Sequence, residues 1–257
     1  MRLKSYILVL ISCVILFSCK SENENAVAIC NTKNIIQPPE DTTIISYIIN
    51  PKKQTLKFYW KNKHDSLIKT FKNLKTEVEN NNEKLIFAVN GGMFKKHFSP
   101  QDLYIEKGKI LSKLDTIQNG FGNFYLQPNG VFSITEKAVS SITTTQNFMS
   151  TSNNYYATQS GPMLVIDGEL NPKFNKGSSN LNIRNGVGVL PNGDLLFAMS
   201  KKEINFHDFA TFFKNNDCES ALYLDGFVSK TYLPSKHWEQ LEGEFGVIIA
   251  EIKPKEN

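Results

Sequence analysis

Four short motifs place polar or charged side chains beside glycine, each next to an apolar run that is typical of a strand. They are Asn90-Gly91-Gly92, Ser160-Gly161-Pro162, Arg184-Asn185-Gly186 and Leu224-Asp225-Gly226. Glycine at a strand end lets backbone N–H groups approach a ligand closely, because no Cβ stands in the way. The repeated pattern predicts one site, assembled where several strands end.

Asp225 is the strongest acidic candidate, since it follows the apolar run 221–224 and precedes a glycine. A carboxylate at the end of a buried strand is typical of a base, a nucleophile or a cation ligand. An Asx turn is the alternative. Asp102 and Glu106 flank the strand-like residues 103–105 and are the candidates for a second catalytic carboxylate.

Arg184 is the strongest candidate for binding an anion. It stands before the apolar run 187–189, where an unpaired buried charge is costly. Its planar guanidinium matches two oxygens of a phosphate, which a lysine does not. A structural salt bridge to a carboxylate is the alternative, and the residues alone favour neither.

Uncharged groups in the same motifs are the other candidate ligands of a substrate. Carboxamides and backbone N–H groups bind phosphate or sugar hydroxyls, and a serine beside glycine either binds a ligand or shapes a turn. A nucleophilic serine is not expected, because no Gly-x-Ser-x-Gly elbow is present. The predicted substrate-binding residues are Asn90, Gly91, Gly92, Ser160, Gly161, Arg184, Asn185, Gly226 and Ser229.

Strand signals dominate the chain that must position these residues. Turn-forming pairs separate or end strand-like runs at 107–108, 129–130, 167–168 and 192–193. Asn-Gly and Asp-Gly pairs readily take the positive φ angles of tight hairpin turns. These signals predict a series of antiparallel hairpins.

Two stretches have the apolar spacing of a helix. One runs from 67 to 78 after a cap at Asp65 or Ser66, and the other runs from 206 to 213 after a cap at Asn205. We therefore predict a single α+β domain over residues 41–257, with a mixed, largely antiparallel β-sheet core and a few flanking helices.

The first residues are typical of an export signal. Arg2 and Lys4 precede an apolar stretch, 7–17, that is shorter than the roughly 20 residues of a membrane span. The Leu-Phe-Ser-Cys that ends at Cys19 resembles a bacterial lipobox. It predicts a signal peptide at 1–18, lipid on Cys19, a tether over 19–40, and a protein anchored to a membrane of the bacterial cell envelope outside the cytoplasm. Plain secretion is the alternative.

The charge balance limits the classes of partner. The 257-residue chain carries a formal charge of +4, and removal of residues 1–18 would leave +2. So slight an excess does not predict binding to nucleic acid. No Cys or His residues have a metal-ligand spacing, so no metal ligand is assigned and a zinc hydrolase is not expected.

Taken in order, the motifs resemble those of the phosphodiester glycosidase family from about residue 85 to residue 249. The family's Asn-Gly-Gly-Phe-type loop, its Ser-Gly-Pro-x-Leu stretch, its Arg before a glycine-bearing strand and its Leu-Asp-Gly match residues 90–94, 160–164, 184–188 and 224–226. One branch of the family continues with two glycines where this chain has Phe227 and Val228. That difference implies a narrower or reshaped pocket.

The resemblance implies an enzyme that hydrolyses the glycosidic C1–O bond of a sugar 1-phosphodiester. Arg184 and the glycine loops would bind the phosphate, and Asp225 would act as base or electrostatic stabiliser. Asp102 or Glu106 would be the second carboxylate. Water or a carboxylate would attack C1 through an oxocarbenium-like state. No cofactor is required, although a divalent cation could share the phosphate charge.

Three other functions are compatible with the sequence. A phosphodiesterase would cleave the P–O bond with the same phosphate-binding residues, and a structural envelope domain would use its glycines for turns alone. A non-catalytic glycan-binding lipoprotein would present an exposed aromatic platform. The residues that could form such a platform are Tyr104, Tyr155, Tyr156, Tyr232 and Trp238.

Overall fold

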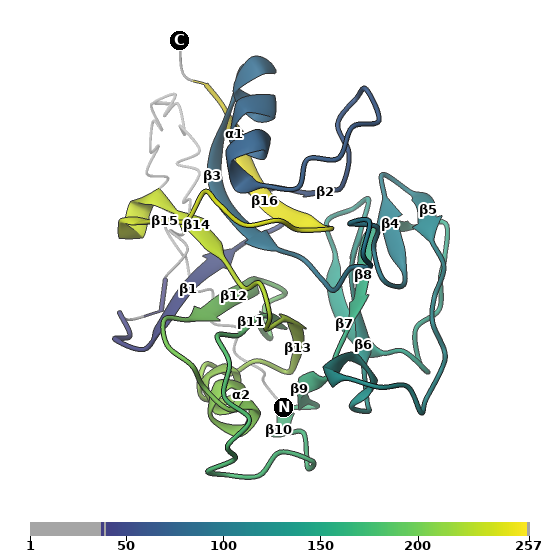
Figure 1. Cartoon of the computed structure of the whole chain (residues 1–257), viewed down its shortest axis with the longest axis vertical. Coiled ribbons are helices and arrows are strands. Elements are labelled where there is room, and N and C mark those ends of the chain that lie inside the picture. The colour runs from purple at the N-terminus through teal and green to yellow at the C-terminus, as the bar shows by residue number, and fades with distance from the viewer. Residues whose placement is uncertain (1–36, 39, 256–257) are drawn as a thin grey trace, which may run out of the picture. The chain divides into compact units, whose positions relative to one another are not determined.

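The computed structural model describes residues 37–38 and 40–255, where the chain forms three β-sheets with two α-helices packed on them (Figure 1). Every pairing between the described strands is antiparallel. The α+β class is confirmed, and the predicted mixed character of the sheet is replaced by antiparallel pairing in this part of the chain.

The predicted signal peptide, Cys19 and most of the predicted tether lie outside the described residues. Gln37, near the end of that tether, bonds to both the backbone N–H and the C=O of Ile48. Contacts with the domain therefore begin before residue 41.

Six strands form the sheet that carries Asn185 and Asp225. In spatial order they are β1 (Ile44–Ile49), β12 (Leu195–Ser200), β11 (Asn185–Val189), β13 (Ser220–Asp225), β9 (Met163–Ile166) and β10 (Glu169–Leu170). Alternate residues of β12 pack on α2 and on the central core. This burial on both faces explains why its sequence is almost continuously apolar.

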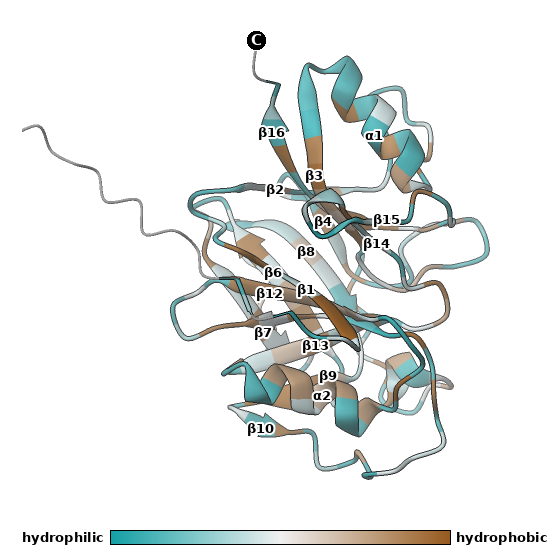
Figure 2. Cartoon of the chain, turned by 90° about the vertical axis from the view of Figure 1, so that its left-hand side faces the viewer, coloured by the Kyte–Doolittle hydropathy of each residue, from teal (hydrophilic) through white to brown (hydrophobic). Residues whose placement is uncertain are grey.

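A second sheet carries Asn90. Its strands, in spatial order, are β15 (Trp238–Glu239), β14 (Thr231–Leu233), β3 (Glu83–Asn90), β16 (Ile248–Pro254) and β2 (Thr55–Tyr59). In Figure 2, β3 is hydrophilic at its first residues and hydrophobic further along. The strand therefore enters the core as it approaches Asn90.

A third sheet carries Ser160. Its strands, in spatial order, are β5 (Lys109–Ser112), β4 (Tyr104–Glu106), β8 (Asn154–Ser160), β6 (Gly130–Thr135) and β7 (Ser140–Thr144). Short 3-10 helices lie at η1 (Asn123–Tyr125) and η2 (Pro234–Lys236).

One apolar core joins the three sheets. Phe87, from the second sheet, lies 5.2 Å from Phe197 of the first sheet, measured between ring centroids. Phe132 of the third sheet lies 6.2 Å from the same Phe197. Such aromatic contacts fix the sheets against one another, and they thereby fix where the strand ends meet.

Both predicted helices are present, but only one of them begins at its predicted residue. Helix α2 (Phe206–Asn215) begins after Asn205, whose Oδ1 accepts a hydrogen bond from the Asp208 N–H, as predicted. Helix α1 (Phe71–Asn80) begins later than predicted, after Thr70 rather than Asp65 or Ser66. Positive φ angles at Asp65 and Lys69 interrupt any earlier helical turn. Within the described residues no helix is long and apolar enough to cross a membrane.

Three predicted hairpin turns, at 107–108, 167–168 and 192–193, are confirmed by the pairing of their flanking strands. The turn predicted at Asn129-Gly130 is wrong, because Gly130 is the first residue of β6. A Cβ there would lie 2.7 Å from the carbonyl oxygen of Thr143. This glycine therefore permits close strand packing instead of a turn.

Candidate active site

Four strand ends from the three sheets meet at one place. Asn90 ends β3, Ser160 ends β8, Asn185 begins β11 and Asp225 ends β13. The Oγ of Ser160 donates a hydrogen bond of 2.9 Å to the carbonyl oxygen of Leu224. The structure thus brings the four glycine motifs together, as their repeated pattern predicts.

Asn185 links the motifs through its side chain. Its Nδ2 donates to the backbone oxygen and to Oδ1 of Asn90, at 2.8 and 3.0 Å. Its Oδ1 accepts hydrogen bonds from the backbone N–H of Asp225 at 2.8 Å and from the Ser229 hydroxyl at 3.4 Å. Because these groups are buried, their hydrogen bonds fix the end of β13 against the end of β3.

Asp225 is buried, yet it borders a cavity. Burial raises the pKa of its carboxyl to about 6, against the opposing effect of the N–H groups of Phe227, Gly226 and Val228 and of the Asn90 amide. The Phe227 N–H donates to Oδ1 at 2.9 Å. The carboxylate is therefore held in one orientation, and its pKa is close to neutral pH, as general bases require.

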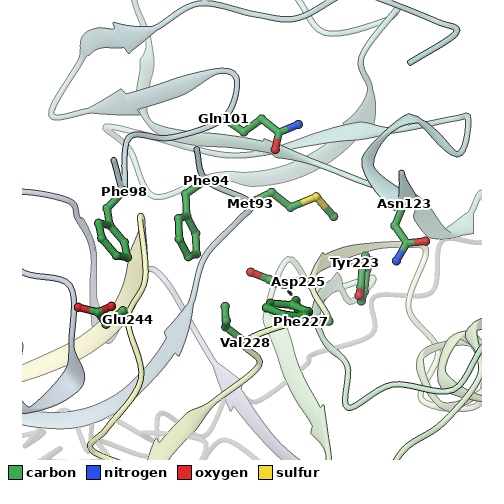
Figure 3. A pocket seen from close by; sticks show the side chains of 11 residues that line it. Met93, Phe94, Phe98, Gln101, Asn123, Tyr223, Asp225, Phe227, Val228 and Glu244 are labelled. Atoms are coloured by element: carbon green, nitrogen blue, oxygen red, sulfur yellow. Dashed lines mark hydrogen bonds between the residues drawn. The ribbon is translucent and has the colours of Figure 1, made fainter. Parts of the chain in front are cut away.

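A cavity of about 620 Å³ lies over Asp225, within the size range of small-molecule sites (Figure 3). Figure 3 shows Asn123 and Tyr223 on one side of Asp225, and Phe94, Phe98 and Glu244 on the other. The residues that line the cavity are Met93, Phe94, Phe98, Gln101, Asn123, Tyr223, Asp225, Gly226, Phe227, Val228 and Glu244.

Comparison with known proteins assigns the family. A family model described as phosphodiester glycosidase matches residues 83–247, which is more than half of the chain. The chain belongs to the phosphodiester glycosidase family. The uncharacterized protein YigE of Escherichia coli strain K12 is 34% identical over 192 residues, which cover 74% of each chain.

Solved structures share the phosphodiester glycosidase fold. The catalytic domain of zebrafish N-acetylglucosamine-1-phosphodiester alpha-N-acetylglucosaminidase, auto-inhibited by its pro-peptide, has a TM-score of 0.56 and 14% identity over 84% of this chain and 85% of that one. A putative exported protein of Burkholderia pseudomallei has a TM-score of 0.52 and 11% identity over 81% of this chain and 73% of that one. At these identities the likeness concerns the fold alone.

The structure places Arg184 behind the cavity wall of this phosphodiester glycosidase domain. Its guanidinium has no exposed surface and stacks 3.6 Å from the centroid of the Phe206 ring. Its Nε donates to the Ile204 carbonyl, and its Nη2 donates to the carbonyl and side-chain oxygens of Asn180. These acceptors are neutral. Among the described residues Arg184 forms no salt bridge with a carboxylate, so the structure does not support that alternative. Direct contact between Arg184 and a phosphate stays a prediction.

The predicted glycine ligands mostly serve packing in this structure. The Gly91 N–H donates to the Val247 carbonyl at 2.8 Å. A side chain on Gly161 would overlap Asn129, and Gly92 has a φ of 150°, which glycine tolerates best. None of these three lines the cavity, whereas Gly226 does. Their role as ligands therefore has no geometric support here.

The two candidates for a second carboxylate, Asp102 and Glu106, are not among the residues that line the cavity. The hydroxyl of Tyr104 donates to Glu106 Oε2 at 2.7 Å. Asp102 is buried, and both burial and the nearby Asp115 raise its pKa to about 7. Glu244 lines the cavity instead. Within residues 37–38 and 40–255, no group of three or more His, Cys, Asp or Glu side chains is placed to hold a metal ion.

Several residues that line the cavity were not predicted from the sequence as site residues. Tyr223 could have been found, because residues two apart in a strand share a face and Tyr223 precedes Asp225 by two. Asn123 begins the short helix η1, and Gln101 and Glu244 lie in connecting segments, where no local pattern marks them.

Three of the five residues of the predicted aromatic platform are buried, and Tyr155 and Trp238 are half-buried. Tyr104, Tyr156 and Tyr232 are buried in the core, so they do not offer a flat surface to a glycan. The aromatic rings at the cavity are those of Phe94 and Phe98, which stack 5.4 Å apart, and that of Phe227. A cavity with acidic groups and these rings fits an enzyme better than a surface lectin.

Proposed function

We propose that this phosphodiester glycosidase domain hydrolyses the C1–O bond of a sugar 1-phosphodiester in the cavity over Asp225. The observation that carries the proposal is the buried Asp225 carboxylate, held by backbone N–H groups at the cavity wall with a pKa of about 6. The family assignment supports the class of reaction.

The chemistry needs one base and a leaving group that departs readily. Asp225 accepts a proton from a water molecule as the water oxygen bonds to C1. The C1–O bond breaks, and its electron pair stays on the phosphate oxygen. Because a phosphate monoester leaves more easily than an alcohol does, a strong general acid is less necessary than in ordinary glycosidases.

Hydrolysis in water enriched in heavy oxygen tests which bond breaks. Purified protein is given a panel of sugar 1-phosphodiesters, and mass spectrometry locates the label. We expect label on the C1 oxygen of the sugar and loss of turnover in Asp225→Asn with the fold intact. Label on the phosphate would instead identify a phosphodiesterase. An absence of turnover together with glycan binding would support the binding-protein alternative.

We also propose that the protein is an exported lipoprotein anchored through Cys19. The support is the sequence of residues 1–19 alone. A fatty-acid label fed to the native cells should appear on the wild-type protein and be absent from Cys19→Ala. Equal labelling of both proteins would contradict the anchor.

A further inference from the structure

No lysine or arginine is among the described residues that line the cavity, although a phosphodiester is an anion. Two of its lining residues, Asp225 and Glu244, are acidic. An anion placed beside Asp225 therefore needs a source of positive potential from behind the wall.

Lys69 and Arg184 contact residues on opposite sides of the cavity, and of these two cations only Lys69 has a carboxylate partner among the described residues. The Nζ of Lys69 lies 4.0 Å from the Phe98 ring centroid and 3.6 Å from Glu244 Oε1. The Glu244 carboxylate therefore offsets much of the lysine's charge. Arg184 donates only to neutral oxygens among the described residues. Of these two cations, Arg184 is therefore the less compensated, and it lies on the Tyr223 side of the cavity.

Tyr223 lies between the Arg184 guanidinium and the cavity. Its Nη1 is buried and has no hydrogen-bond partner within the described residues. Its Cζ lies 5.4 Å from the Tyr223 ring centroid. Arg184 and Asn123 both lie near enough to the Tyr223 hydroxyl to lower the pKa of Tyr223, against the larger effect of burial. A tyrosine hydroxyl carries one hydrogen, which can turn toward an acceptor such as a phosphate oxygen.

The cavity is where that acceptor would lie. Tyr223 lines it, and the hydroxyl stands where a side chain on Gly226 would begin. Burial raises the pKa of Tyr223, so the hydroxyl keeps its hydrogen near neutral pH.

The geometry points to a phosphate subsite formed by the Tyr223 hydroxyl and the Asn123 carboxamide, with the buried Arg184 as the cation behind it. This assignment rests on the proposed function for the identity of the substrate. The sugar then lies on the other side of Asp225, against the stacked rings of Phe94 and Phe98 (Figure 3). C1 comes next to the carboxylate, and Tyr223 stabilises the charge that gathers on the leaving phosphate.

Binding of inorganic phosphate tests the subsite without any turnover. A titration followed by nuclear magnetic resonance should show phosphate binding to the wild-type protein. We expect Tyr223→Phe to weaken that binding about tenfold, since a hydrogen bond to a charged acceptor is lost. Tyr232→Phe is the matched control, because Tyr232 is also buried, lies under Lys75 and is absent from the cavity lining. It should bind phosphate as the wild type does.

Asn123→Asp provides a second variant at a half-buried position on η1. Its new carboxylate should repel phosphate and weaken binding by about tenfold or more. Phosphate binding that is undetectable in the wild type, or equal in the wild type and both variants, would overturn the subsite. Loss of turnover in Asp225→Asn would still support the glycosidase proposal in that case. Conversely, weakened phosphate binding in the variants without any turnover by the wild type would support the subsite and overturn the glycosidase.

Discussion

The Asn185 Oδ1 accepts the backbone N–H of Asp225 at 2.8 Å, while the Nδ2 of the same carboxamide donates to Asn90. One side chain thereby sets the point at which the chain leaves β13 and turns into the loop that holds the Asp225 carboxylate. An asparagine suits this position because it supplies an acceptor and two donors at once. Aspartate has the same shape but lacks the donors.

Asn185→Asp should therefore destabilise the fold. The change removes the Asn185 donor from two buried oxygens of Asn90, of which Oδ1 keeps only the Lys230 N–H, and it adds a charge beside Asp225. We therefore expect a loss of about 3 kcal/mol in the free energy of unfolding. Urea denaturation measures this loss. Asn147→Asp, at an exposed position, should change the free energy by no more than about 0.5 kcal/mol. Equal effects of the two variants would contradict the linking role of Asn185.

The rate should depend on the ionisation of Asp225. A base must be deprotonated to act, and the Asp225 pKa is about 6. We expect kcat/KM to fall about tenfold for each unit of pH below that value and to level off above it. Residual activity of Asp225→Asn should lack this dependence. A wild-type profile that is flat through pH 6 would exclude Asp225 as the titrating base.

Stability should depend on the ionisation of Asp102. Its pKa is raised from 3.8 to about 7, by burial first and by Asp115 second. The folded state therefore holds this proton more tightly than the unfolded state. The stabilisation is present in full below 3.8 and is lost as the pH rises through about 7, with a slope of at most about 1.4 kcal/mol per unit.

Asp102→Asn should flatten that pH dependence, because the amide resembles the protonated carboxyl and does not ionise. Denaturation midpoints across this pH window measure the effect. Asp65→Asn, at an exposed position, should keep the wild-type slope. A wild-type protein that is as stable at pH 8 as at pH 5 would show that Asp102 does not hold a raised pKa.

Phe227 should contribute to substrate binding and little to stability. Its side chain is 96% exposed, yet it lines the cavity. We expect Phe227→Ala to raise KM about fivefold, which corresponds to roughly 1 kcal/mol of lost contact. Phe121 is equally exposed and lies outside the lining, so Phe121→Ala should leave KM unchanged. An equal rise of KM in both variants would contradict a role of Phe227 in substrate binding.

Much of the fold could be predicted from local patterns. The pairs Lys107-Gly108, Asp167-Gly168 and Asn192-Gly193 determine backbone angles within a few residues, so the hairpins follow from the sequence. Asn205 likewise marks the start of α2 through its own side chain. The predicted start of α1 was wrong because a lysine does not indicate a positive φ, and Lys69 has one.

The candidate site was only partly predictable. Asp225 and Asn185 stand beside glycine at strand ends, which is a local signal that the structure bears out as geometry. The position of Arg184 behind Tyr223, and not in the cavity, depends on the path of the segment that supplies Asn180 and Ile204. Sequence spacing shows that an arginine is buried, but it does not show which face of the wall the guanidinium occupies.

Gly226 and Tyr223 should be energetically coupled. A side chain on Gly226 would overlap the Tyr223 oxygen, so Gly226→Ala should cost about 2 kcal/mol of unfolding free energy in the wild-type background. In Tyr223→Phe the oxygen is gone, and the nearest ring carbon would lie 2.9 Å from the new Cβ. The same substitution should then cost about half as much, because a smaller displacement relieves the overlap. A double-mutant cycle followed by urea denaturation measures the difference. Additive effects would mean that the hydroxyl does not occupy this space in solution, which would also weaken its assignment to the phosphate subsite.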